Sequence, residues 1–173
     1  MLDIRLIKAP LVIHFEKIDR NREIFEKEFN SLSEFEEDSV GQWLKLAKAK
    51  GETEDSDPVL LTLIVELHKK VDQLSSLIKK EERSLISLSN HEMIDSIAFE
   101  NISLEGDFFE ENREYYCRIE MPVFPKREMP VFIKALSSNI GQILLMHDRD
   151  LKDWNSYVAS RERVMIRELK AKA

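Results

Sequence analysis

Residues 115–121 read YYCRIEM and alternate strictly between two faces. One face carries Tyr115, Cys117, Ile119 and Met121. The other face carries Tyr116, Arg118 and Glu120. An alternation of period two is typical of a β-strand that has one face in the core and one face in water. The pattern therefore predicts a half-buried strand, with Cys117 on its inward face.

Strand-forming segments continue on both sides of this strand, at residues 94–99, 131–136 and 140–146. They are separated by the turn-forming groups SLEGD, PVFPKREMP and SSNIG. Four or more short strands within about 55 residues indicate a small antiparallel sheet or barrel. Helical spacing returns over residues 148–170, with acidic residues at the start and basic residues at the end, and predicts a closing helix.

Upstream of the strands, residues 57–83 carry apolar side chains at a regular 3-4 spacing. Read as heptads, the d positions are Leu60, Leu67 and Leu74, and the a positions are Ile64, Val71 and Ile78. Such a seam is normally buried against another helix, and β-branched a residues with Leu at d favour a parallel pair. Extra Leu residues beside the seam also fit a larger bundle. The pattern therefore predicts an oligomerisation helix.

The start of that helix and the segments before it are also predicted. Asp57 is suited to cap the free amides, and Pro58 is suited to the first helical position. Residues 11–50 are expected to form two helices around a polar, acidic loop at 31–41, and residues 51–58 an acidic linker. The expected fold is α+β, with a helical region at 1–56, the heptad helix at 57–86 and a β-barrel with a closing helix at 87–173.

Composition and charge argue against several classes of function. The formal charge of −7 is spread evenly, so no concentrated basic surface is expected for nucleic acid. No apolar run approaches the roughly 18 residues of a membrane helix, and the N-terminus is too charged for a signal peptide. A single Cys fits a reducing cytoplasm. We expect a cytoplasmic protein that neither binds nucleic acid nor inserts into a membrane.

No catalytic or metal-binding pattern stands out. His14, His68, His91 and His147 are too far apart in sequence for a local metal-ligand spacing, and Cys117 has no activating partner at a recognisable spacing. With four Gly in the whole chain, there is no glycine-rich phosphate loop. The expectation is a protein without enzymatic activity, metal or cofactor.

The segment Asn101-Ile102-Ser103-Leu104-Glu105-Gly106 resembles the D/N-x-S-x-x-G signature of PilZ domains. The helix around Trp154 also resembles the closing helix of that family. The resemblance implies a small β-barrel and, in many members, binding of cyclic di-GMP. With the heptad helix in front, the chain is most similar to the atypical PilZ variant that forms tetramers through a long inserted helix.

The resemblance implies nucleotide contacts by Asn101, Ser103 and Gly106, and by an R-x-x-x-R segment upstream. This chain offers Lys79 and Arg83 at that spacing, and a lysine lacks the planar fork of guanidinium. Three more arginines, Arg113, Arg118 and Arg127, are possible cationic groups for a non-standard site. In a second register, which we favour, residues 95–99 form the early strand and NISLEG the following loop. No nucleotide-contacting residues remain in that register.

The resemblance and the seam together imply a homo-oligomeric regulatory or scaffold protein of bacterial second-messenger or surface-motility signalling. Its partners would be its own copies and other signalling or motility proteins. The first alternative is a cyclic di-GMP receptor that uses the incomplete arginine motif and NISLEG. The second is a helical adaptor whose seam binds another protein.

Overall fold

The computed structural model describes residues 5–34, 39–78, 85–122 and 127–172. The chain divides into two compact units. We call them the barrel unit, which comprises Met1–Phe29 and Ser87–Ala173, and the helical unit, which comprises Asn30–Ile86. Within the described residues, no helix combines the length and the apolar composition that crossing a membrane requires.

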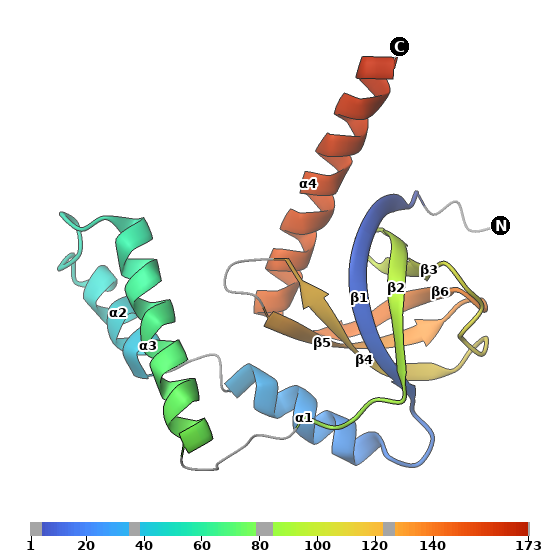
Figure 1. Ribbon diagram of the computed structural model, residues 1–173, viewed down its shortest axis with the longest axis horizontal. Coiled ribbons are helices and arrows are strands. Elements are labelled where there is room, and N and C mark those ends of the chain that lie inside the picture. The colour runs from blue at the N-terminus through green and yellow to red at the C-terminus, as the bar shows by residue number, and fades with distance from the viewer. Residues whose placement is uncertain (1–4, 35–38, 79–84, 123–126, 173) are drawn as a thin grey trace. The chain divides into compact units, whose positions relative to one another are not determined.

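Six strands of the barrel unit close into an antiparallel barrel in the order β1-β2-β3-β6-β5-β4 (Figure 1). Their bounds are β1 Ile7–Lys17, β2 Asn90–Ile97, β3 Asn101–Leu104, β4 Glu114–Met121, β5 Arg127–Ala135 and β6 Ile140–Met146. The barrel closes because β1 pairs with both β2 and β4, so no sheet edge is left open. The predicted antiparallel barrel is confirmed.

The strand β1 corrects the expectation that the chain begins with a helical region. Its inward residues are Ile7, Ala9, Leu11, Ile13 and Phe15, which alternate with more exposed ones. Pro10 lies where the β1–β2 register shifts, a place that tolerates a residue without an N–H donor. The prediction of a helix that includes residues 11–17 was wrong. It relied on Ile13, Lys17 and Ile18, whose spacing also fits a helix, although residues 7–17 form a strand. The helical region therefore follows the first strand instead of preceding the barrel.

The strands at the centre of the sequence match their predictions more closely. β4 and β6 have nearly the expected bounds, and Cys117 is fully buried on the inward face. Residues 95–97 belong to β2 as expected. However, Asn101–Leu104 form the short strand β3 between β2 and β6, so these residues are not the loop that the favoured register required.

The helix α4 (Asp148–Lys172) completes the barrel core and confirms the predicted closing helix. Trp154 and Val158 are buried in the core, and the Trp154 indole Nε1–H donates to the carbonyl of Phe99 at 3.0 Å. Arg127 of β5 pairs with Asp150 in the first turn of α4 at 2.8 Å. An apolar contact and an ion pair therefore both fix the start of the helix to the barrel.

The helix α1 (Arg22–Glu34) covers part of the outer barrel wall. Phe25 stacks on Tyr116 with ring centroids 5.1 Å apart, and Phe29 lies 5.2 Å from Phe132. Tyr116 and Arg118 are consequently buried, although they lie on the strand face that the alternation assigned to water. The prediction that this face of β4 is exposed to solvent was wrong at Tyr116 and Arg118, because α1, which is distant in sequence, packs over them.

The helical unit contains α2 (Ser39–Ala49) and α3 (Pro58–Ile78), which contact each other. Gly51 ends α2 with a positive φ of 77°, and Glu52 N–H donates to the carbonyl of Ala47 at 3.0 Å, as in a Schellman motif. Asp57 caps α3 as predicted, because its Oδ1 accepts from the backbone N–H of Val59 at 2.8 Å. The helix was predicted to end between residues 83 and 88. Residues 79–84 lie outside the described residues, and residues 85–88 are not helical, so the predicted helical end at residue 86 was wrong.

Candidate functional site

The main candidate site is an apolar stripe along α3. It consists of the predicted seam residues Leu60, Ile64, Leu67, Val71 and Leu74, and each leaves 50–63% of its surface exposed. The sixth seam residue, Ile78, ends the helix, and its side chain lies outside the described part of the chain. We call the five exposed residues the α3 stripe.

Other apolar side chains of the helical unit are exposed as well. They are Trp43 and Leu46 on α2, and Val59 and Leu63 on α3. Leu61 and Val65 are partly buried, on a different side of α3 from the stripe. Monomeric proteins rarely leave contiguous apolar surface of this kind, and larger patches commonly mark interaction sites. The exposed apolar side chains of the helical unit are therefore a candidate interaction surface.

The motif residues Asn101 and Ser103 lie on the same side of β3, and Gly106 follows at a bend. Asn101 is partly exposed, whereas Ser103 is 6% exposed and lies opposite Ser96 of β2. Beside Gly106 lies the Phe108 ring, since a Cβ added to the glycine would meet Phe108 Cε2 at 2.6 Å. Phe108 thus occupies the space that a bare glycine leaves next to the motif.

Among the cationic candidates that the structure describes, Arg113 forms an ion pair with Glu110 at 4.0 Å. Lys79 and Arg83 lie outside the described residues. Arg118 pairs with Glu28 at 2.6 Å, and Arg127 pairs with Asp150. Both arginines hold elements of the barrel unit together, so their guanidinium groups have structural partners.

A buried polar network joins α1 to the outer wall of β4. The Glu28 carboxylate accepts from the Tyr116 hydroxyl at 2.8 Å and from Arg118 at 2.6 Å. Burial raises the pKa of Tyr116 far above its ordinary value, and the negative charge of Glu28 adds to the effect. The Tyr116 hydroxyl therefore stays protonated and acts as a fixed hydrogen-bond donor. Sequence analysis missed this network because its members lie about 90 residues apart.

Cys117 has the environment of a core residue. Its side chain is fully buried, and burial raises the pKa of the thiol well above its ordinary value. The reactive form of cysteine is the thiolate, which this environment disfavours. The predicted inward position of Cys117 is confirmed, and its surroundings are those of a small apolar side chain.

Comparison with known proteins gives one weak structural similarity. No protein-family model matches the chain, and a search of curated proteins also finds no match. Among solved structures, the chain is similar to a pathogenic protein from Xanthomonas campestris, described as a tetrameric PilZ domain self-assembled via an unusual helical bundle. The two share 12% identity with a TM-score of 0.33, over 98% of this chain and 93% of that chain. Because this similarity is too weak to establish a family, we infer function from the residues of this chain alone.

Proposed function

We propose that this protein is a non-enzymatic, PilZ-like regulatory or scaffold protein that assembles through α3. The observation that carries the proposal is the α3 stripe, whose five side chains are about half exposed or more in the single chain. Its setting would be bacterial second-messenger or surface-motility signalling, as the NISLEG motif and a barrel with a closing helix suggest. Its partners would be copies of itself and other signalling or motility proteins.

The energetics of the stripe favour assembly. Fully burying one aliphatic side chain of this size contributes roughly 1.5–3 kcal/mol. Ile64 and Val71 at a positions alternate with Leu60, Leu67 and Leu74 at d positions, which is the arrangement of a parallel pair of helices. Leu63 widens the apolar surface on one side, which also allows a larger bundle. Copies of α3 would therefore bury the same stripe that a single chain leaves in water.

The same proposal includes the loss of standard cyclic di-GMP binding. Three observations support it: a lysine at residue 79 in place of an arginine, the burial of Ser103, and the Phe108 ring beside Gly106. A lysine cannot form the bidentate, stacking contacts of a guanidinium group. The barrel would then serve as a protein-binding or structural module.

The proposal is tested by placing charges in the stripe. In the double variant Leu67→Lys with Val71→Lys, we expect the assembly to dissociate to the 20.3 kDa chain, as measured by light scattering after size-exclusion chromatography. The matched control is Asp72→Asn with Gln73→Lys, which changes the charge equally at exposed positions outside the stripe. The proposal is wrong if the wild-type protein is monomeric, or if the stripe variant keeps the wild-type mass.

A cyclic di-GMP receptor is the second candidate function. It is favoured by the position of Asn101 and Ser103 on one side of β3, close to the bend at Gly106. Titration calorimetry of the wild-type protein and of Arg83→Ala distinguishes the two functions. Micromolar binding that Arg83→Ala abolishes would support the receptor, whereas no heat of binding would support the scaffold.

A further inference from the structure

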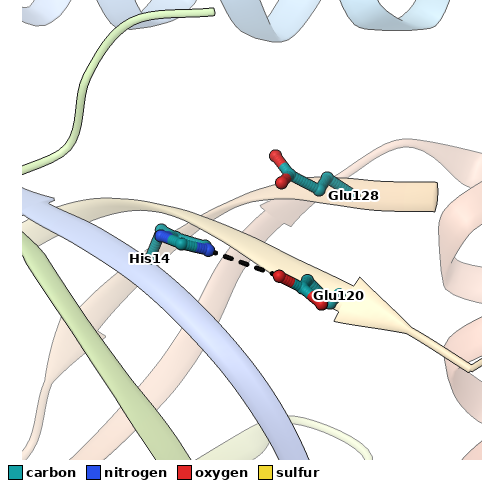
Figure 2. A group of neighbouring side chains, drawn as sticks. All are labelled: His14, Glu120 and Glu128. Atoms are coloured by element: carbon teal, nitrogen blue, oxygen red, sulfur yellow. Dashed lines mark hydrogen bonds and ion pairs between the residues drawn. The ribbon is translucent and has the colours of Figure 1, made fainter.

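We propose that the outer wall of the barrel binds one divalent transition-metal ion, of which Zn²⁺ is the representative, through His14, Glu120 and Glu128. These three side chains come from β1, β4 and β5, which are neighbours in the barrel (Figure 2). The register places Glu120 directly opposite Glu128, and His14 one diagonal step from Glu120. The barrel thus brings together residues that the sequence keeps far apart.

The distances between the donor atoms fit a small ion. His14 Nε2 lies 3.5 Å from Glu120 Oε1, and one donor atom from each of the three residues lies within 4.8 Å of the other two. Ligands around a tetrahedral Zn²⁺ at about 2.0–2.2 Å are separated by roughly 3.3–3.6 Å. The His14–Glu120 pair therefore already has nearly the required spacing. Glu128 reaches it through rotation of a side chain that is only partly buried.

A second imidazole lies on the next strand, beside the three-residue group. His91 of β2 pairs with His14 across the β1–β2 ladder, and their ring centroids are 4.7 Å apart. On the outer wall, β2 and β1 thus present the two imidazoles opposite each other, and β4 and β5 present the two carboxylates opposite each other, one diagonal step away. Imidazole nitrogen with carboxylate oxygen suits Zn²⁺ and related first-row ions better than Mg²⁺ or Ca²⁺, which favour oxygen ligands alone.

The charged groups around the site are two opposed carboxylates and the Arg118 guanidinium. Like charges directly opposite each other on neighbouring strands are destabilising, and Glu120 and Glu128 form such a pair. Arg118 donates from Nε to Glu128 at 2.9 Å, but the same guanidinium also binds Glu28 at 2.6 Å. A divalent ion between the two carboxylates would relieve their repulsion while Arg118 keeps its contact with Glu28. It would also join β1 to β4, the pair that closes the barrel.

The test uses the full-length protein and Zn²⁺ itself. After removal of metal with a chelator, equilibrium dialysis and titration calorimetry should show one Zn²⁺ per chain. Binding should raise the midpoint of thermal unfolding, because the ion binds the folded state. In His14→Ala and in the nearly isosteric Glu120→Gln, the affinity should fall by at least about tenfold. The histidine ring signals of His14 and His91 in nuclear magnetic resonance spectra should shift in the wild-type protein.

His68→Ala is the matched control. His68 forms a histidine–carboxylate pair with Asp72 at 3.4 Å on α3, and no third ligand for this pair occurs among the residues that the structure describes. This variant should bind Zn²⁺ as the wild-type protein does. The proposal is overturned if the wild-type protein binds no stoichiometric Zn²⁺. It is equally overturned if Glu120→Gln, folded by circular dichroism, binds as tightly as the wild type.

Discussion

In the barrel unit, Ile13 and Ile119 are completely buried, whereas in the helical unit Ile64 and Val71 leave half of their surface in water. The two units also differ in how their elements are held. Each barrel strand pairs with two neighbours, and α4 adds Trp154 to the core. α3 contacts α2 through one side and leaves its α3 stripe uncovered. The barrel unit thus has a self-contained core, while the helical unit has an exposed apolar surface.

An isoleucine-to-alanine substitution should change the free energy of unfolding very differently in the two units, and this is the largest expected effect. We expect Ile13→Ala to lower the free energy of unfolding of the barrel by about 2–5 kcal/mol, because it leaves a cavity in a packed core. Ile64→Ala should change it by about 0.5 kcal/mol or less at concentrations where the chains are dissociated. Urea unfolding followed by fluorescence measures both effects.

The two tryptophans make this measurement specific. Trp154 lies in the barrel core, whereas Trp43 is exposed on α2. In a Trp43→Phe background, the fluorescence of Trp154 reports the barrel alone, and the difference from the protein with both tryptophans reports the helical unit. Equal losses of stability for Ile13→Ala and Ile64→Ala would contradict the contrast between the two units.

The buried network beneath α1 gives the next largest effect. Glu28→Ala leaves Arg118 and the Tyr116 hydroxyl without their shared acceptor, and should cost about 3 kcal/mol of barrel stability. Glu26→Ala removes an exposed pair with Arg22 on the same helix and should cost less than about 0.5 kcal/mol. Thermal or urea unfolding of both variants tests this. Equal losses of stability in Glu28→Ala and Glu26→Ala would mean that the buried Glu28 network does not stabilise the barrel more than an exposed ion pair does.

A smaller effect is expected at the start of α3. Asp57→Ala removes the acceptor for the Val59 amide and should destabilise the helix by about 1 kcal/mol. Faster hydrogen exchange in the first turn of α3, with unchanged exchange in the barrel strands, is the expected result. Asp55→Ala, two residues earlier, is the control and should leave the exchange rates of α3 unchanged. Altered exchange in the barrel would show that the two units unfold together.

The smallest effect concerns the pH dependence of the β1–β2 pair. Lys8 forms an ion pair with Asp95, and the hydrogen bond from Lys8 lowers the pKa of the Asp95 carboxyl. Because the folded pKa lies below the unfolded value of about 4, the pair stabilises the barrel above that pH and loses its effect as the pH falls through the folded pKa. The stability difference between the wild type and Asp95→Asn should shrink below about pH 4. A difference that persists in strong acid would contradict this assignment.

Strongly periodic segments were predictable from sequence, and short or ambiguous ones were not. β4, β6 and α4 repeat their pattern over several turns or residue pairs, so the sequence alone indicated their type. β3 spans four residues that include Asn101 and Ser103, too few to show an alternation. β1 was misread because the first residues of a longer alternation were omitted: Ile7 and Ala9 complete the inward row that begins before Leu11.

The two candidate sites also differ in how far they could be predicted from the sequence. The α3 stripe depends on spacing within one helix, so its residues were identified from sequence and found exposed. The His14–Glu120–Glu128 group depends on strand register across the barrel, and His14 lies 106 residues from Glu120. Without a correct β1, no sequence pattern connected them. Tyr116 and Arg118 were assigned to water for the related reason that α1, which covers them, belongs to another part of the chain.

Because the helical unit lies between β1 and β2 in the sequence, the ribosome synthesises α2 and α3 before β2. Residues 18–89 separate these two paired strands, so β1 leaves the exit tunnel well before either of its partners. At about 5–20 residues per second, α3 is complete seconds before β2 has been made. Under the proposed assembly through α3, nascent chains translated from one messenger RNA would therefore meet while their barrels are still open. Assembly during translation would then precede, and not follow, the maturation of each subunit.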